Sequence, residues 1–300
     1  MKNDTYSYVA LGSFDGLHKG HLSLIKKTVE LAKKINGMSI VYTFKNHPRK
    51  FIKSIDNPKL LLDNESKKEI LKKENVDLVY FEEFNEDYMK LSPEEFVKYL
   101  CEKFNVKGIV VGFNYRFGYK NSGDVNLLKK LSKIYNYELY VMEPCTYNEE
   151  AISSTKVRQA LIRGALNEAN EMLTRPFFIK GEVVHGKQLG RTIGFPTANL
   201  NFSKDIILPK IGVYYTNVLW NNNIYRGITS IGNNPTVNGE KITLETFILD
   251  FNEDIYDEEI KVYFIKFFRE EKKFASIEKL KEQLNFDAKR AAKENILVME

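Results

Sequence analysis

The chain has 300 residues, of which 43% are hydrophobic and 28% are charged, and its formal net charge is +5. This composition is typical of a folded soluble protein and leaves room for two domains. The small positive charge is compatible with anionic small substrates, and no basic patch with interleaved aromatic residues favours nucleic acid. No apolar stretch approaches the ~20 residues of a membrane span, and no apolar signal core follows Met1–Thr5.

The chain has two cysteines, Cys101 and Cys145, and neither belongs to a CxxC pair. Cys101 falls at an apolar position of an expected helix, and Cys145 follows Pro144. We therefore expect both thiols to be reduced and structural, and we expect the protein to be cytoplasmic. The sequence leaves the oligomeric state open, and a monomer is compatible with it.

The first half of the chain alternates short apolar runs with helical patterns. Strands are expected at residues 6–11, 38–44, 78–81, 108–111 and 138–142. Helices are expected at residues 22–32, after Ser92, at 127–135, from a Ser154 cap to Gly164, and at 165–173. Ser92 can cap its helix and Glu95 completes a capping box. Alternating strands and helices predict a parallel sheet covered by helices.

The pattern changes at Thr174-Arg175-Pro176, and we place the domain boundary between residues 175 and 176. Beyond it, β-rich runs recur without intervening helices, at residues 177–185, 213–220, 225–231, 243–249 and 260–268. Such runs, separated by turn residues, predict a closed or partly closed antiparallel barrel. Ile277, Leu280 and Leu284, with Lys and Glu between them, predict a terminal amphipathic helix.

The first candidate site is the segment GSFDGLHKGH at residues 12–21. It follows the first strand and leads into the first helix, where free backbone N–H groups and the helix dipole favour an anion. His18 and His21 are three residues apart, so on a first helical turn they face the same way. Imidazoles beside phosphates can donate to charge that develops during transfer. The alternative is a strand–turn–helix with two incidental histidines.

GxFDGxHxGH resembles the motif of the HxGH adenylyl- and cytidylyltransferases. Three later segments narrow the resemblance: NHPR at 46–49, VGFNYRFG at 111–118 and ISSTKVR at 152–158. Together they resemble the bacterial bifunctional riboflavin kinase/FAD synthetase family, over essentially the whole chain and in the expected order. The resemblance implies a Rossmann-like nucleotidyltransferase domain at the N-terminus.

The resemblance also implies roles for individual residues. His18 and His21 are expected to contact the ATP phosphates and the transition state. Further ATP or phosphate contacts are expected at Gly12, Phe14, Asp15, Gly20, Ser154, Thr155 and Arg158. Flavin or nucleotide contacts are expected at His47, Pro48 and Asn114. For Ser154, Thr155 and Arg158 the alternative is a helix cap with a surface arginine.

The second candidate site combines a basic loop, GKQLGR at 186–191, with the segment GFPTAN at 194–199. Gly186 bares backbone N–H groups, Lys187 and Arg191 supply positive charge, and Thr197 offers an oxygen for Mg²⁺. The spacing of a Walker loop is absent. We expect 186–191 to be flexible, and the alternative for it alone is a turn with solvated basic side chains.

GFPTAN resembles the metal–nucleotide motif of riboflavin kinases. This implies that Thr197 and Asn199 hold Mg²⁺ and phosphate, and that a strand glutamate is the catalytic base. Glu245 in TLETF fits, because it alternates with Phe247 and Leu249 on one strand face and can accept a hydroxyl proton there. The alternative is a rim glutamate paired with a lysine.

We therefore predict an α/β domain at 1–175, with a parallel sheet, and an antiparallel β-barrel with a terminal helix at 176–300. The resemblance implies that the barrel phosphorylates riboflavin to FMN with ATP and that the N-terminal domain adenylylates FMN to FAD, releasing pyrophosphate. The predicted partners are the small molecules ATP, riboflavin and FMN, with Mg²⁺ as cofactor, and neither nucleic acid nor membrane.

Three other functions compete with this prediction. One is a single-activity adenylyl- or cytidylyltransferase with a non-catalytic barrel, and another is a flavin-binding regulator or carrier. The third, nucleic-acid binding, lacks a basic patch with interleaved aromatic residues. The sequence also departs from the family pattern at three positions. Asn121 stands where relatives often carry arginine, Thr174 precedes Arg175-Pro176 where glycine is usual, and Asp257 replaces a turn glycine.

Overall fold

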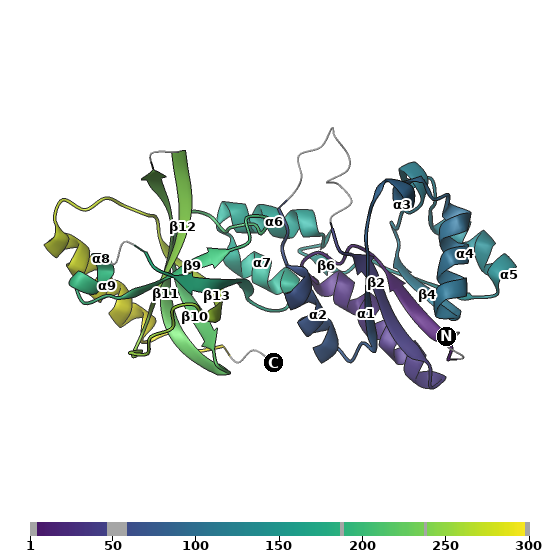
Figure 1. The fold of residues 1–300 in the computed structure, drawn as a ribbon, viewed down its shortest axis with the longest axis horizontal. Helices are drawn as coiled ribbons and strands as arrows, with labels where there is room; N and C mark the ends of the chain where they lie inside the picture. The colour runs from purple at the N-terminus through teal and green to yellow at the C-terminus, as the bar shows by residue number, and fades with distance from the viewer. Residues whose placement is uncertain (1–4, 47–58, 187–188, 237–238, 298–300) are drawn as a thin grey trace. The chain divides into compact units, whose positions relative to one another are not determined.

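The computed structural model describes residues 5–46, 59–186, 189–236 and 239–297 (Figure 1). Packing divides the chain into two compact units, Met1–Ser154 and Thr155–Glu300. This division falls before the boundary expected at residues 175 and 176, because the two helices that precede Pro176 group with the second unit. The residue at which the two catalytic domains join stays a prediction.

The first unit holds a five-stranded sheet in the order β3-β2-β1-β4-β5, and every pair in it is parallel. Its strands are β1 Ser7–Leu11, β2 Met38–Phe44, β3 Leu78–Glu82, β4 Val106–Gly112 and β5 Glu138–Met142. Its helices are α1 Lys19–Lys34, α2 Asn64–Lys73, α3 Glu86–Lys90, α4 Pro93–Phe104 and α5 Val125–Tyr135, with a 3-10 turn η2 at Tyr119–Asn121. A hairpin of β6 Thr146–Tyr147 and β7 Glu150–Ala151 follows.

The central strands are apolar on both faces because helices cover both faces. All five residues of β1 are buried. Val9 and Leu11 belong to a core shared with α4 and α5, whereas α1 packs on β1, β2 and β4. The expected capping box is present: the Ser92 hydroxyl caps α4 and the Glu95 carboxylate returns to the Ser92 backbone. The predicted α/β architecture of this unit is confirmed.

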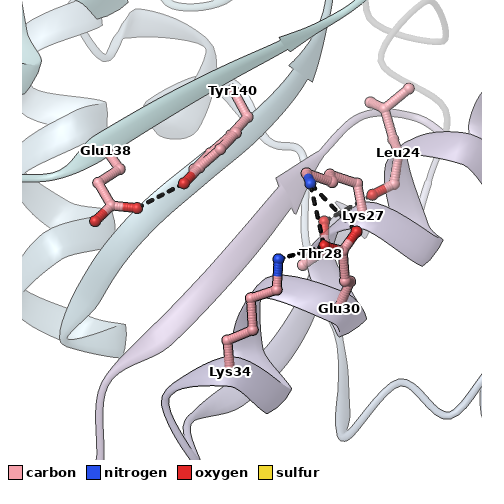
Figure 2. Close-up of polar contacts among 7 residues, drawn as sticks. All are labelled: Leu24, Lys27, Thr28, Glu30, Lys34, Glu138 and Tyr140. Atoms are coloured by element: carbon pink, nitrogen blue, oxygen red, sulfur yellow. Dashed lines mark hydrogen bonds and ion pairs between the residues drawn. The ribbon is translucent and has the colours of Figure 1, made fainter.

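Figure 2 shows polar contacts on helix α1 and on strand β5 of this unit. Lys27 and Lys34 both bind Glu30 along α1, at 3.2 and 2.6 Å. On edge strand β5 the Tyr140 hydroxyl donates to Glu138 at 2.8 Å. The two lysines hold the pKa of Glu30 below its usual value, but exposed pairs of this kind contribute little to stability.

Cys101 lies half-buried on α4, and both cysteines are free thiols. Burial, with a smaller contribution from the Glu102 carboxylate, raises the pKa of Cys101 to about 11. At pH 8 its thiolate fraction is therefore on the order of 100-fold below that of an ordinary cysteine. We expect iodoacetamide to label Cys101 correspondingly slowly, as followed by peptide mass spectrometry. Labelling of the native protein as fast as of the urea-unfolded chain would contradict this.

The second unit is built around a closed barrel in the order β10-β11-β12-β9-β8-β13. Its strands are β8 Phe177–Val184, β9 Thr197–Phe202, β10 Gly212–Trp220, β11 Asn223–Thr236, β12 Gly239–Ile248 and β13 Glu259–Arg269. Its helices are α6 Ser154–Arg163, of which the first residue belongs to the first unit, α7 Leu166–Leu173, α8 Leu189–Thr192 and the terminal α9 Ile277–Ala291. The prediction of an antiparallel barrel with a terminal helix is confirmed, and the barrel is closed.

The barrel interior contains a row of hydroxyl groups as well as apolar side chains. Thr216, Thr229 and Thr246 come from neighbouring strands, are fully buried, and are joined Oγ1 to Oγ1 at 2.9 Å in each step. Each hydroxyl thus forms a hydrogen bond with a neighbouring hydroxyl, as buried polar groups require. Helix α9 is fixed to the barrel by Arg269, which binds the buried Asp287 carboxylate at 2.8 Å.

Three local expectations differ from the structure. The β-rich runs read from the sequence include no strand at residues 197–202, but β9 begins at Thr197 because these residues pair with β12 and β8. The expectation of a flexible loop through Arg191 is wrong in part, because α8 occupies Leu189–Thr192. Helix α6 begins at Ser154 itself, so Ser154 is not the residue that precedes it. Among the described residues, no helix is both long and apolar enough to cross a membrane.

Candidate active sites

The topology brings the first candidate segment to one edge of the parallel sheet. Strand order reverses between β1 and β4, and ligands of open α/β sheets bind at the carboxyl ends of the strands at such a point. Gly12 follows β1 there. Asn114 follows β4 and is exposed. The structure therefore places the predicted flavin or nucleotide residue at the same edge as the predicted phosphate segment.

The segment between β1 and α1 has a constrained backbone. Phe14 and Leu17 have positive φ angles of 48° and 45°, and both side chains are fully buried. Bulky residues pay roughly 1–3 kcal/mol each for this conformation. Gly16 also has a positive φ, of 81°, and a Cβ on it would lie 2.7 Å from Leu61. The chain turns tightly here at a cost that the surrounding contacts must offset.

The two histidines lie together at the start of α1. Their rings stack with centroids 3.7 Å apart and planes 18° apart, and the Phe14 ring meets His21 edge-on at 5.3 Å. His18 is the N-cap of α1, and its Nδ1 accepts from the His21 backbone N–H at 3.4 Å. The neutral His18 ring therefore carries its proton on Nε2. Gly20 lies against His18, since a Cβ there would come within 3.3 Å of the ring.

Several side chains form hydrogen bonds with residues 13–15 of the loop that precedes the histidines. The buried Asp15 carboxylate accepts from the Leu61 backbone N–H at 2.9 Å. The Ser154 hydroxyl donates to the Asp15 carbonyl at 2.8 Å. The Ser13 carbonyl accepts from the Thr43 hydroxyl and from Lys67 Nζ, each at 3.0 Å. The contacts of the Asp15 carboxylate and the Ser154 hydroxyl fix the loop backbone, a role that the sequence did not suggest.

Lys67, like Thr43, contacts this loop but was not predicted from the sequence. It lies on α2 and is only 5% exposed. Burial lowers the pKa of Lys67 to about 8, although the Asp15 and Asp63 carboxylates oppose that change. Asp63 followed by Ser66 is a readable cap signal for α2. No sequence pattern shows that one lysine of the helix points inward.

The remaining predicted residues of the first site are placed as follows. Thr155 and Arg158 lie on α6, with Thr155 exposed and Arg158 half-buried. Asn121, the departure from the family pattern, has a positive φ of 58° in η2 and is exposed. His47 and Pro48 lie outside the described residues.

In the barrel, strand pairing brings three predicted residues together. Glu245 of β12 lies directly opposite Asn199 of β9, so their side chains share one face of the sheet. Thr197 lies two residues from Asn199 and shares that face. Its Oγ1 lies 3.5 Å from Glu245 Oε2, and the Asn199 amide lies 3.4 Å from the Thr197 carbonyl.

A cavity of about 360 Å³ adjoins this group. Its volume lies in the ~300–1,000 Å³ range of small-molecule sites. The predicted residues Gly186, Arg191, Thr197 and Asn199 all line it. The segment from Phe251 to Tyr256 also lines the cavity. It was not predicted as part of a site, although Asn252-Glu253-Asp254 is a sequence typical of a turn. Lys187, predicted to supply charge here, lies outside the described residues.

Two glycines make the close packing beside this cavity possible. A Cβ on Gly186 would lie 2.3 Å from the Asn199 side-chain amide. A Cβ on Gly190 would lie 2.2 Å from the Phe195 carbonyl oxygen. Neither distance is possible for real atoms, so the glycines of GKQLGR serve close approach here. Only glycine at these two positions lets the backbone lie this close to Asn199 and to Phe195.

The sequence matches two families, FAD synthetase over residues 1–156 and riboflavin kinase over residues 173–295. The chain belongs to the bifunctional riboflavin kinase/FMN adenylyltransferase family. Relatives of that name include one from Listeria monocytogenes, 37% identical over 95% of this chain and 91% of the relative. Another, from Escherichia coli strain K12, is 36% identical over 93% and 90%.

The fold agrees with a solved structure. A crystal structure described as a macrolide-efflux protein from Streptococcus pneumoniae superposes with a TM-score of 0.90 at 34% identity, covering 98% of this chain and 96% of that one. The chain is thus a bifunctional transferase of flavin-cofactor biosynthesis, with the adenylyltransferase domain first and the kinase domain second. The alternatives of a single-activity transferase and of a flavin carrier do not account for matches in both halves.

Proposed function

We propose that the segment at residues 12–21 performs adenylyl transfer. The FMN phosphate attacks the α-phosphate of ATP, and pyrophosphate leaves without a covalent enzyme intermediate. His18 and His21 donate to the phosphates as negative charge develops, aided by the N-terminus of α1. The observation that carries this proposal is the stacked imidazole pair at the start of that helix. Asn114, at the end of β4, positions the flavin or the nucleotide.

We propose that the barrel performs phosphorylation of riboflavin at the group formed by Thr197, Asn199 and Glu245. Glu245 orients the 5′-hydroxyl of riboflavin and accepts its proton as the hydroxyl oxygen bonds to the γ-phosphorus of ATP. The bond from the γ-phosphorus to the bridging oxygen breaks, and ADP leaves. The cavity beside Thr197 holds substrate, and Arg191 in its lining supplies positive charge toward phosphate. Positioning and electrostatics carry both reactions, as is general for phosphoryl transfer.

The same group fits Mg²⁺. The Thr197 hydroxyl lies 3.5 Å from the Glu245 carboxylate, and Asn199, which pairs with Glu245, carries an amide oxygen. Mg²⁺ prefers such oxygens together with substrate phosphates. Within the described residues no cluster of three His, Cys, Asp or Glu side chains offers a ready-made metal site, which suits a cation carried largely by ATP. Bound there, Mg²⁺ would offset the charge of the ATP phosphates.

One assay tests both proposed sites. The purified protein is incubated with riboflavin and ATP, with Mg²⁺ or with EDTA, and the flavins are separated by chromatography over time. We expect FMN to appear first and FAD afterwards, no product in EDTA, and recovery on adding Mg²⁺. FMN formation that persists in EDTA would contradict the metal site, and FMN without FAD would contradict the adenylyl-transfer site.

We propose a cytoplasmic location. The two cysteines are free thiols, and cysteines stay reduced in that compartment. The proposed partners are the small molecules ATP, riboflavin and FMN.

A further inference from the structure

The loop that leads into the imidazole pair needs a clamp, because its backbone is strained. Phe14 and Leu17 both hold positive φ angles, and Phe14 contacts the His21 ring. Strained conformations of this kind persist only where surrounding contacts over-determine them. The contacts that hold Ser13, immediately before Phe14, therefore decide where the ring and the histidine beside it lie.

The Ser13 carbonyl is held from two elements. Thr43 of β2 donates its hydroxyl, and Lys67 of α2 donates its ammonium, each at 3.0 Å. Thr43 is fully buried and Lys67 nearly so. A hydrogen bond from an ionised donor is roughly twice as strong as one between neutral groups. Burying an ammonium is costly, and the hydrogen bond that this buried lysine donates goes to the loop carbonyl, which indicates that the position of the loop matters.

We propose that Lys67 is a positioning residue for adenylyl transfer, whose ammonium clamps the Ser13 carbonyl and so fixes Phe14 and the His18–His21 pair. The inference rests on the proposed role of residues 12–21. Lys67 acts through the loop, because its ammonium is directed to a backbone carbonyl.

The surroundings of Lys67 make its charge sensitive to pH. Asp15 faces it from the loop and Asp63 from the start of α2, and both favour the charged form. Lys45, at the end of β2, lines the same small cavity. Burial outweighs the two carboxylates, so the pKa of Lys67 falls to about 8. The clamp is therefore charged below about pH 8 and loses its charge as the pH rises through that value.

The test replaces Lys67 by methionine, which has similar length and no charge. Lys67→Met is expected to lower kcat for FAD formation by about 10–100-fold, while KM for ATP and FMN changes less than about threefold. FMN formation by the barrel serves as the internal reference and stays unchanged. Lys68→Met, on the exposed side of the same helix, is the matched control and keeps both activities.

Two further readouts separate this role from a merely structural one. In wild type, kcat for FAD formation relative to FMN formation falls between pH 8 and 9, whereas in Lys67→Met the ratio is flat. Hydrogen exchange of the amides at residues 13–17 is faster in Lys67→Met. The proposal is overturned if Lys67→Met keeps kcat for FAD formation within twofold of wild type. It is also overturned if the ratio of FAD formation to FMN formation has the same pH profile in wild type and in Lys67→Met.

A second variant covers loss of folding. If the amides of β1 and β2 are not protected from hydrogen exchange in Lys67→Met, that variant is not folded, and Thr43→Val is tested instead. Thr43→Val removes the uncharged donor to the same carbonyl. It is expected to lower kcat for FAD formation by about 3–10-fold and to keep the fall above pH 8, and an unchanged kcat overturns the proposal. The proposed site is tested separately. If wild type forms FAD and a His18 variant does not, the site at residues 12–21 is correct whatever the result for Lys67.

Discussion

Replacing Glu245 by glutamine is expected to lower the rate of FMN formation by about 1,000-fold, within the usual range for loss of a general base. Glutamine keeps the shape of the side chain and its place opposite Asn199, but it cannot accept the hydroxyl proton of riboflavin. The barrel should therefore remain folded. The measurement is initial-rate FMN formation from riboflavin and ATP with Mg²⁺, followed by chromatography.

The same polypeptide supplies the control for this variant. FAD formation from added FMN takes place in the other domain and should be unchanged in Glu245→Gln. Thr243→Val, at a half-exposed position of the same strand, tests whether any polar change on β12 has the same effect. If Glu245→Gln forms FMN at more than about a tenth of the wild-type rate, Glu245 is not the base.

The second large effect is expected in the N-terminal domain. Replacing His18 by asparagine should lower FAD formation from FMN by about 100–1,000-fold, as loss of one oxyanion donor does elsewhere. Asparagine is a good N-cap, so it can still accept from the His21 backbone N–H and preserve the start of α1. What is lost is the imidazole, with its Nε2 donor and its stack on His21.

FMN formation in the barrel again reports on the amount of active protein. Thermal unfolding followed by circular dichroism should place His18→Asn close to wild type, because the cap is conserved in kind. A variant that forms FAD within threefold of the wild-type rate would remove His18 from the mechanism and leave the phosphate contacts to the helix N-terminus alone.

The sequence determined the fold class and most elements of this protein. Strands β2 and β5 occupy the expected residues, and the Ser92 capping box is present. These features depend on local chemistry: side-chain periodicity, caps and turn residues act within a few positions of one another. The two candidate segments were likewise found from contiguous residues, since a phosphate-binding loop is short.

Elements defined by pairing rather than by local pattern were missed. Strand β9 has the unremarkable sequence TANLNF and is a strand because β12 and β8 lie on either side of it. The sequence from Phe251 to Tyr256 predicts only a turn. That these residues line the cavity is evident only from the folded barrel. Such assignments depend on contacts between residues far apart in the chain.

Local sequence patterns were thus enough to predict the kind of each domain, the order of the domains and the two candidate segments. Only the tertiary structure decided that Phe14 is held with a positive φ, that Glu245 comes within 3.5 Å of Thr197, and that Lys67 is directed inward to Ser13. The physical reason is that strain, burial and pKa depend on what surrounds a group in space. Composition and periodicity describe only what precedes and follows it along the chain.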